Sequence, residues 1–436
     1  MQAGFNTVDV TPPVGSQLNG FIARLSSSTD VDAPLMVRAL YLENEQTSLL
    51  IVGLDVLGIV PEFADRMVDD LSLHMGISKD SVLLASSHTH SGPMTVPLRG
   101  LGPADDEYLV VLAEKIRQAA IAARDDKHAV TLSWGTAPLS IAVNRRQVMP
   151  DDGRVVLGDN PDGPCETDVR VLQLAGEDRT ILLFHYACHP YFLRADSSLI
   201  SSDYYGHAAA ALERQGYDCI YLNGCSGDIG PPADRDGPEA ARRAGQELAE
   251  AVLVACGNAS VDENRILQIA SSHFGLPHDA LDDMHKIEND LAKADCTVRP
   301  QESGEPVVQS RLKTAWHEWF DKLQQAARRP NGLEPLPARI SIVRIGGGTV
   351  VALPGEVFYD LGRRVAAEIS GEPLCVAAYC HGYIGYVPDA ESLVAGGYES
   401  EESHRYVGLW QVSPQAEEIL KEYVNGLWKS MGAKSI

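Results

Sequence analysis

The sequence predicts an α/β protein in which a mixed sheet core is flanked by helices. Short segments rich in Val, Ile and Leu, bounded by Gly, Asp or Pro, have the length and composition of strands. Longer stretches with apolar residues at helical spacing lie between them. This alternation favours an α/β fold. Neither an internal repeat nor a clean linker divides the 436 residues, so we expect a single domain over 1–436.

Each element is expected where its pattern is continuous. The predicted strands are 40–42, 48–54, 81–86, 129–134, 170–173, 181–186, 218–222, 340–345, 349–353 and 374–378. The predicted helices are 62–75, 106–124, 205–215, 238–255, 281–294, 310–327, 358–369 and 414–431. Three glycines at 346–348 predict a hairpin turn. A charged, mostly helical stretch at about 275–338 is an insertion or an outer layer, and the Gly-rich stretch 389–406 is expected to be an active-site loop.

Composition argues against several classes of partner. The chain has 36 Lys and Arg against 60 Asp and Glu, a formal net charge of −24, whereas nucleic acids and anionic membranes are bound by clustered cations. We therefore expect a small-molecule substrate, no nucleic-acid partner and no strong membrane association; no pattern indicates an oligomeric state.

No signal sequence is visible, no apolar run reaches the ~18 residues of a membrane span, and the eight cysteines form no CxxC. These features predict a cytoplasmic protein with reduced thiols.

Polar residues follow five of the apolar runs at the point where each run ends. In open α/β sheets, ligands bind beyond the carboxyl ends of the strands, so we expect these five ends to line one pocket. The residues are His88 and His90 after SVLLASS, His185 and His189 after ILLF, 223–228 after DCIYL, Glu356 after VVALPG, and His381, Tyr383 and Tyr386 after LCVAAYC.

Two histidines and one glutamate from separate strand ends form a zinc ligand set of the catalytic kind, with a position open for water. In an extended segment the imidazoles of His88 and His90 share a face about 6.6–6.8 Å apart, so one binds the metal and the other the substrate, or both bind the metal. Pro190 biases His189 to an extended conformation, although a buried core histidine fits that position equally well. Glu356 is either a ligand or a charge at a helix start.

Other catalytic signatures are absent or weak. The chain contains no HExxH and no GxSxG motif. Cys225 lies in the turn-like segment GCSGD, but no base is paired with it in the sequence, so cysteine catalysis is a weaker alternative.

Several motifs occur in an order that spans most of the chain: GFNTVDVTPP, LNGF and DAPLMVRAL near the start, HTHSGP at 88–93, His189-Pro190, SD-x-x-G-x-A from Ser202, GDI at 227–229, LPGE at 353–356 with GRR at 362–364, and Tyr386 followed twelve residues later by Tyr398-Glu399. The chain thereby resembles the catalytic domain of the neutral/alkaline (non-lysosomal) ceramidases and their bacterial relatives. HTHSGP is highly specific for that family.

The resemblance implies a site as well as a fold. It implies one Zn²⁺ per chain, held by His88, His189, Glu356 and Tyr386. Tyr383, in the same HGYIGY segment, competes with Tyr386 for the ligand position. The resemblance also implies that the scissile group is contacted by His90, Arg145 (with Arg146 next to it) and Tyr398.

Three departures from the family shape the expected substrate. The position of the family's catalytic serine is Gly230 here, in GDIGPP, so water activated by zinc is the expected attacking group. The chain ends about 80 residues after Glu356 and shows neither the family's C-terminal immunoglobulin-like domain nor its secretion signal. We therefore expect a soluble substrate rather than a membrane lipid.

Together these observations predict a zinc-dependent amidohydrolase that cleaves an N-acyl amide, either ceramide-like, as in sphingolipid metabolism, or a soluble relative. Zinc hydrolysis of an ester, lactone or glycosidic bond is the alternative, and a non-catalytic zinc protein is the third. Asp55, Asp228 and His185 are expected to support the ligands or to line the pocket.

Overall fold

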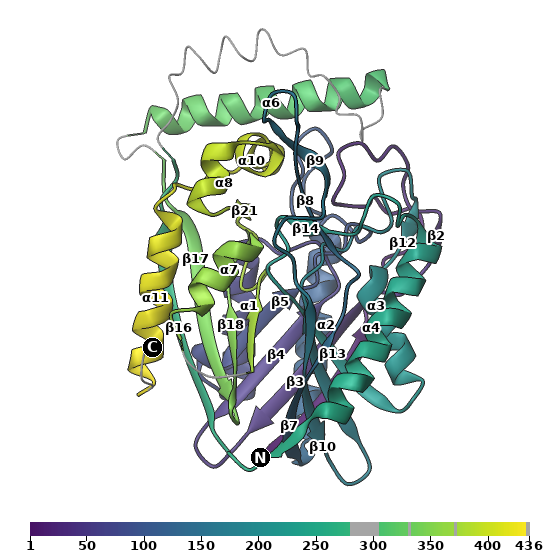
Figure 1. Ribbon diagram of the computed structural model, residues 1–436, viewed down its shortest axis with the longest axis vertical. Helices are drawn as coiled ribbons and strands as arrows, with labels where there is room; N and C mark the ends of the chain where they lie inside the picture. Colours follow the sequence, from purple (N-terminus) through teal and green to yellow (C-terminus); the bar gives the residue numbers. More distant parts are fainter. Residues whose placement is uncertain (280–304, 330–332, 370–372, 433–436) are drawn as a thin grey trace.

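Three sheets form the framework of the chain, and each carries helices on its outer face (Figure 1). The computed structural model describes residues 1–279, 305–329, 333–369 and 373–432. The predicted mixed α/β class is confirmed. The first sheet has the order β5-β4-β3-β1-β6 and is covered by α1 and α2. Its elements are β1 (Gln2–Asp9), β3 (Met36–Glu43), β4 (Ser48–Leu54), α1 (Pro61–Met75), the short 3₁₀ turn η1 (Lys79–Ser81), β5 (Val82–Ser86), α2 (Asp106–Asp125) and β6 (His128–Ala129).

The second sheet has the order β13-β11-β10-β7-β15, and helices α3 and α4 pack on it. Small residues at helical spacing let α4 approach the sheet closely, and its buried face includes Ala241, Ala244 and Leu248. The elements are β7 (Thr131–Pro138), β10 (Asp168–Ala175), β11 (Thr180–Tyr186), α3 (Asp203–Glu213), β13 (Tyr217–Asn223), α4 (Pro238–Asn258) and β15 (Ser260–Asp262).

The third sheet has the order β16-β17-β18-β20, and α7 and α11 cover it. Strands β17 and β18 form the hairpin that the three glycines predict, with Ile345 opposite Gly348. The elements are β16 (Leu267–Leu276), β17 (Leu336–Ile345), β18 (Gly348–Ala352), α7 (Tyr359–Ala366), β20 (Leu374–Ala377) and α11 (Ala416–Ser430).

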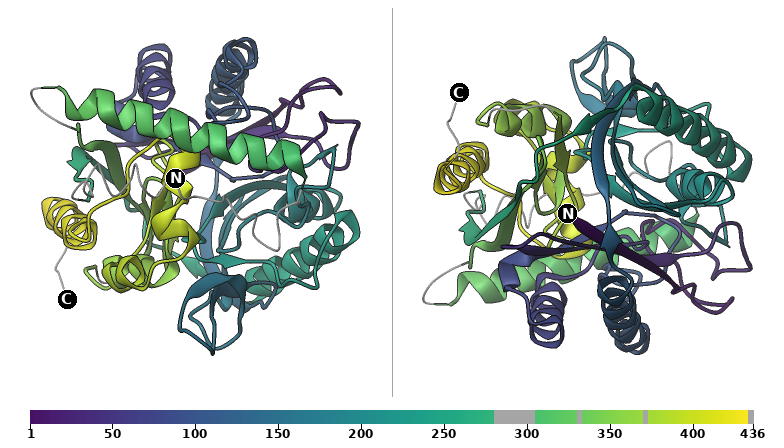
Figure 2. Two further views of the ribbon diagram at one scale, coloured as in Figure 1. Left: turned by 90° about the horizontal axis from the view of Figure 1, so that it is seen from above. Right: turned by 90° about the horizontal axis from the view of Figure 1, so that it is seen from below.

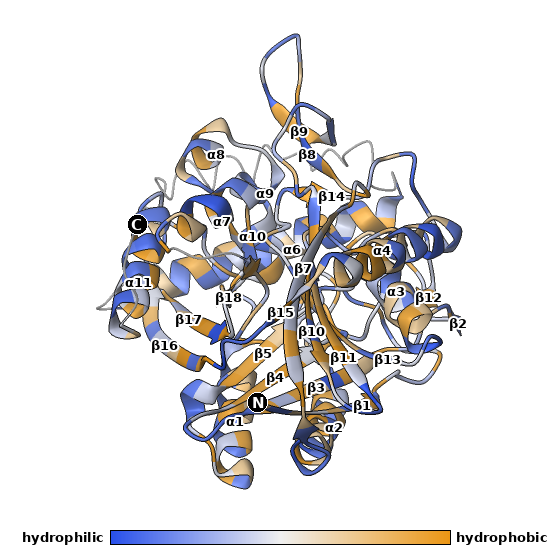
Figure 3. Cartoon of the chain, turned by 60° about the horizontal axis from the view of Figure 1, so that its bottom comes forward, coloured by the Kyte–Doolittle hydropathy of each residue, from blue (hydrophilic) through white to orange (hydrophobic). Residues whose placement is uncertain are grey.

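Each sheet contains one parallel β-α-β unit among otherwise antiparallel strands. The units are β4-α1-β5, β11-α3-β13 and β18-α7-β20. The sheets share an apolar core that includes Leu83, Ile220 and Val350, one from each sheet. Figure 2 shows the helix pairs on three different sides, and Figure 3 shows the apolar strands gathered between them. The three units therefore point their loops toward a common centre.

The carboxyl ends of the three parallel units are joined by hydrogen bonds. The backbone N–H of Ser86 donates to Tyr379 O, and that of Ala378 donates to Asn223 O, each at 3.0 Å. The side-chain amide of Asn223 donates to Ser87 O at 3.0 Å. Strand ends from all three sheets are thus held together, which is the convergence that the sequence predicts for the polar residues.

Two segments differ from expectation or extend it. The stretch 389–406, expected to be a loop, contains short helices, and the first of them begins at the cap residue Asp389, which accepts a hydrogen bond from Ser392 N. Between β16 and β17, the charged stretch contains α6, which crosses one end of the molecule (Figure 1); the predicted helix 281–294 lies outside the described residues.

Within the described residues, no helix is both long and apolar enough to cross a membrane. The remaining elements are β2 (Asp30–Val31), β8 (Val143–Val148), β9 (Val155–Asn160), β12 (Leu199–Ile200), β14 (Ile229–Gly230), α6 (Pro306–Ala327), β19 (Glu356–Val357), β21 (Tyr386–Val387), α8 (Ala390–Ala395), α9 (Tyr398–Glu401) and α10 (Ser403–Val407).

Candidate active site

Three buried histidines lie at the common centre of the strand ends. His88 and His90 follow β5, and His189 follows β11. Their Nε2 atoms form a triangle with sides of 3.1 Å (88 to 189), 3.3 Å (88 to 90) and 2.9 Å (90 to 189). In a tetrahedral zinc site with Zn–N bonds of about 2.0–2.1 Å, ligand atoms lie about 3.3 Å apart. The triangle therefore has dimensions that suit one metal ion.

Backbone carbonyls fix two of the imidazole rings. His88 Nδ1 lies 2.6 Å from Leu57 O, and His189 Nδ1 lies 3.1 Å from Ser226 O. Because a carbonyl only accepts, both rings carry their proton on Nδ1 and leave Nε2 free to bind a metal. His88 reaches this position with φ +72°, a conformation that costs a non-glycine residue free energy and concentrates at functional sites.

Burial keeps the rings of His189 and His90 neutral, which is the form that binds metals. The pKa of His189 is held well below its usual value, first by burial and then by the charge of Arg145. The pKa of His90 is also well below its usual value, by burial and then by the charges of His88 and Arg24. Close packing of Gly20 holds the His90 ring in place: a Cβ at Gly20 would lie 2.6 Å from His90 Cγ.

Glu356 completes the cluster from the third sheet. Its Oε2 lies 3.1 Å from His88 Nε2 and 3.7 Å from His189 Nε2, yet it is buried without a hydrogen-bond partner. Burial raises the pKa of this carboxyl, but the nearby His88 and the hydrogen bond that Tyr383 donates to Oε1 outweigh it, and the pKa stays below its usual value. An unpartnered buried carboxylate oxygen beside three imidazoles fits a divalent cation in both charge and ligand type.

The two tyrosines of the HGYIGY segment have different partners. Tyr383 Oη donates to Glu356 Oε1 at 2.6 Å. Tyr386 Oη accepts from Arg145 Nη2 at 2.8 Å, although β21, which begins at Tyr386, pairs directly with Glu356 of β19. Sequence reasoning left these tyrosines in competition, and the structure shows that one orients the carboxylate while the other is bound by a guanidinium.

Arg145 is the member of the Arg145–Arg146 pair that faces the site. Both guanidiniums bind Glu399, each at 3.0 Å. Arg145 also donates to Gly227 O and Tyr386 Oη. Arg146 instead turns to the backbone carbonyls of 392 and 396. Glu399 therefore positions Arg145 and compensates its buried charge.

A cavity of about 150 Å³ adjoins the histidines. Its polar lining includes His90, Arg145, Tyr386 and Tyr398, so the structure brings these predicted residues together. The rings of Tyr386 and Tyr398 lie 6.0 Å apart, in edge contact. The apolar lining is Phe21, Ile22, Ala23, Leu98, Leu157, Ala195, Pro231, Ala233 and Tyr406.

Three predicted supporting residues are bonded elsewhere. Asp55 accepts from Arg38 and Met36 N, and burial raises its pKa. His185 Nε2 lies 3.1 Å from Val376 O, and its pKa falls to about 3, by burial and then the charge of Arg170. The carboxylate of Asp228 accepts from Asn144 and Tyr359 N, while its carbonyl accepts from Arg145 N and so helps to place that residue.

Cys225 lies in a separate cavity of about 190 Å³, together with His185. Burial raises the pKa of the Cys225 thiol well above its usual value. The Sγ of Cys225 and the Nε2 of His185 both lie near the carbonyl of Val376. Because a nucleophilic cysteine needs a thiolate and a base, this arrangement argues against cysteine catalysis.

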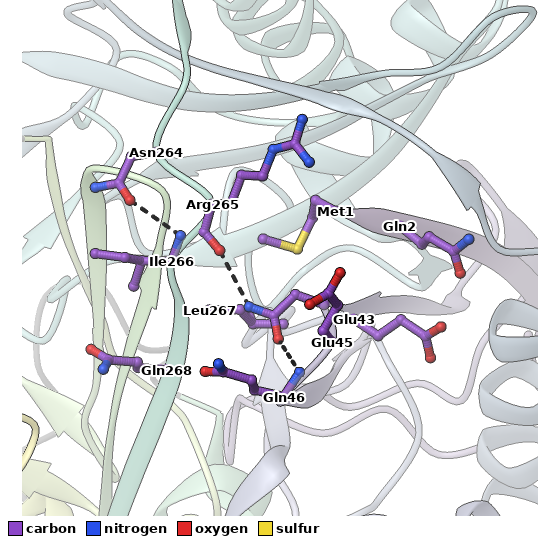
Figure 4. A pocket seen from close by; sticks show the side chains of 11 residues that line it. Met1, Gln2, Glu43, Glu45, Gln46, Asn264, Arg265, Ile266, Leu267 and Gln268 are labelled. Atoms are coloured by element: carbon purple, nitrogen blue, oxygen red, sulfur yellow. Dashed lines mark hydrogen bonds between the residues drawn. The ribbon is translucent and has the colours of Figure 1, made fainter.

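A larger cavity, of about 640 Å³, lies away from this cluster (Figure 4). It lies between the β3–β4 turn, the N-terminal residue and the segment that leads into β16. Its carboxylate Glu43 is bound by Lys127 and Tyr41. None of the predicted site residues lines this cavity.

Two residues that pack against the histidines are not among those that the sequence predicts for the site. The ring of Tyr379 stacks on His88 with centroids 4.3 Å apart, and its hydroxyl bonds Ser226. Tyr191 packs against His90 and His189. Both tyrosines lie within two residues of a predicted site segment, so adjacency to HisPro and to HGYIGY is the signal that could have found them.

Known proteins match this chain only in structure: a scan of protein-family models finds no match, and a search of curated protein sequences finds none. A solved structure of a ceramidase complexed with C2 superposes with a TM-score of 0.75 at 14% identity, covering 99% of this chain and 75% of that one. Neutral ceramidase from Pseudomonas aeruginosa superposes with a TM-score of 0.70 at 16% identity, covering 99% and 74%. The chain therefore has the fold of the neutral ceramidases.

Proposed function

We propose that this protein is a zinc-dependent hydrolase that cleaves the amide bond of an N-acyl substrate. The observation that carries the proposal is the unpartnered, buried Oε2 of Glu356 beside three Nε2 atoms. Both structural neighbours are ceramidases, and the acyl bond of a ceramide is an amide. That likeness supports amide hydrolysis over the alternatives that share the metal.

The proposed ligands are His88, His189, Glu356 and Tyr386, which leaves His90, the third imidazole of the cluster, to act on the substrate. When bound, zinc supplies Lewis-acid polarisation of the carbonyl and a water of lowered pKa. Tyr383 holds Glu356 through a 2.6 Å hydrogen bond. Burial raises the pKa of Tyr386 well above its usual value, and the charge of Arg145, which donates to Tyr386 Oη, opposes that rise. The carbonyls of 57 and 226 hold the two imidazoles.

The remaining polar groups of the cavity act on the substrate. Arg145 and Tyr398 are positioned to donate to the oxygen that gains negative charge, and the loss of one such donor costs about 10²–10³ in kcat. His90 has its Nε2 at the cluster and its ring at the cavity wall, where it would accept a proton from the attacking water and pass it to the leaving nitrogen.

Metal content tests the first part of the proposal. We expect one zinc per purified chain by elemental analysis, and loss of both zinc and turnover in His88→Ala and Glu356→Ala. His207→Ala is the matched control, because His207 pairs with Asp32 and does not line the cavity of the candidate site. A wild-type protein that cannot be loaded with stoichiometric zinc refutes the proposal.

Substrate comparison tests the second part. Short-chain N-acyl amino acids and a short fluorogenic ceramide should be assayed side by side with zinc-loaded protein. We expect amide hydrolysis of the soluble compounds, because the 150 Å³ cavity is comparable to one that holds a benzene molecule. Turnover of esters with no turnover of amides contradicts the amide assignment while leaving the metal site intact.

A further inference from the structure

Arg194 lies at the junction of two cavities. It follows His189 by five residues on the same loop. It lines the 150 Å³ cavity of the candidate site, and it also lines an outer groove of about 460 Å³ with residues 23–26, 195–197 and Asp236. A substrate group that extends from the inner cavity to the groove therefore passes this guanidinium.

The guanidinium of Arg194 has donors to spare. Its Nη2 makes two long hydrogen bonds of 3.4 Å, to the carbonyls of Pro232 and Ala233. Its Nε is buried and makes none, although Asp236 Oδ1 lies 3.4 Å away. A guanidinium carries five N–H donors in a planar fork, so most of the hydrogen-bonding capacity of this one is unused within the fold.

Three carboxylates, Asp159, Asp196 and Asp236, line the two cavities, and none of them saturates the guanidinium; within the described residues Arg194 forms an ion pair with Asp236 and none with Asp196. Asp236 is about half exposed, with 47% of its side-chain surface accessible, so water screens the pair. Asp159 also lines the inner cavity, but both of its oxygens accept from Ala233 N. That bond fixes the loop whose carbonyls face Arg194, and the guanidinium is left able to bind another anion.

The backbone of Arg194 is fixed by a second arginine. Arg24, a buried residue, donates to the carbonyls of Arg194, Ser197, Asn19 and His90. This clamp joins the loop of Arg194 to the segment that carries His90. A guanidinium fixed at its base, with free donors at its tip, is preorganised to bind a ligand.

Tyr191 connects Arg194 to the polar groups of the candidate site. The ring of Tyr191 lies 5.9 Å from the ring of His90 and 5.9 Å from the Arg194 guanidinium, and the Arg145 guanidinium lies over the same ring at 5.7 Å. His90 is the group proposed above to act on the leaving nitrogen. Arg194 therefore lies within one aromatic ring of that group.

We propose that Arg194 binds a carboxylate on the leaving amine, and that the substrates are N-acyl amino acids. Arginine binds carboxylates through two parallel N–H···O bonds, which give both affinity and orientation. The inference rests on the proposed function for the hydrolytic step. It makes Arg194 a specificity-determining residue that contacts the substrate away from the scissile bond.

A substrate pair that differs only in charge tests the inference. N-hexanoylglycine and N-hexanoylethanolamine share the acyl group and the amide, and differ in a carboxylate against a hydroxymethyl group. With zinc-loaded wild type we expect kcat/KM to be at least tenfold higher for the glycine conjugate. In Arg194→Gln that advantage should disappear, mainly through a higher KM, while the ethanolamine conjugate changes less than twofold. Arg194→Lys should keep part of the preference.

Arg235→Gln is the matched control, since Arg235 lies on the neighbouring loop, pairs with Glu247 and lines neither cavity. Equal or faster turnover of the ethanolamine conjugate by wild type overturns the inference, as does an equal loss for both substrates in Arg194→Gln. If wild type cleaves neither compound, the proposed function fails. Calorimetric binding of N-hexanoylglycine then decides the role of Arg194: tighter binding by wild type than by Arg194→Gln supports it, and equal affinity overturns it.

Discussion

Replacing Tyr383 with Phe tests how the candidate metal site is supported. Tyr383 Oη donates to Glu356 Oε1 at 2.6 Å, and both side chains are buried. A hydrogen bond to a charged group contributes about 1.5–3 kcal/mol. Loss of a group that orients a metal ligand lowers affinity about 10–100-fold, which is about 1.4–2.7 kcal/mol. The two ranges agree, so Tyr383→Phe should weaken zinc binding about 10–100-fold while the fold persists.

A competition titration against a chromophoric zinc chelator measures this change. Tyr386→Phe is the companion variant, and Tyr217→Phe, at a partly buried position on β13, controls for the loss of a hydroxyl. Wild-type zinc affinity in Tyr383→Phe refutes the reasoning. If Tyr383→Phe loses zinc entirely and Tyr386→Phe keeps it unchanged, then the ligand tyrosine is Tyr383.

Three further outcomes are expected. His90→Ala should keep zinc and lose about 10²–10⁴ in turnover; loss of zinc by elemental analysis makes His90 a ligand. Acyl length tested from two to twelve carbons should give the highest kcat/KM near six, since the cavity is about 150 Å³; a steady rise to twelve contradicts this. Burial raises the pKa of Asp203 to about 7 from 3.8, so the folded state binds the proton more tightly. Stability from this group is full below pH 4 and falls by roughly 4 kcal/mol toward pH 7. Urea unfolding of Asp203→Asn should lack this loss, and parallel pH curves for the two proteins would refute it.

The sequence predicts the framework well because its signals are local. Strands such as β4 and β11 are uninterrupted apolar runs, and helices such as α1 and α2 have continuous amphipathic patterns with recognisable ends. The strand β1 was missed because its second half carries the polar residues Asn6, Thr7 and Asp9, which are exposed or half-buried. The stretch 389–406 was expected to be a loop because it is rich in Gly, whereas a short helix begins at the cap residue Asp389.

Candidate residues were easier to find than their partners. His88, His189 and Glu356 stand at strand ends, where a polar residue after an apolar run is visible in the sequence. The bonds from His88 Nδ1 to the carbonyl of Leu57, and from Tyr383 to Glu356, depend on backbone geometry and rotamers that no local pattern encodes. Asp55 illustrates the limit, because its position after β4 suggested a bond to a histidine, whereas Arg38 takes that carboxylate.

The placement of the cluster explains why no compact motif marks it. Each parallel unit contributes one part: His88 comes from the first sheet, His189 from the second and Glu356 from the third. The two histidines are 101 residues apart in sequence, so these atoms meet only after the three units have docked on their shared core. Before the units dock, there is no site. In the docked state, desolvated imidazoles and a bare carboxylate oxygen lie about 3 Å apart, which is unfavourable without a cation. A metal bound here would therefore join the three sheets, and its binding free energy would add to the stability of the docked state.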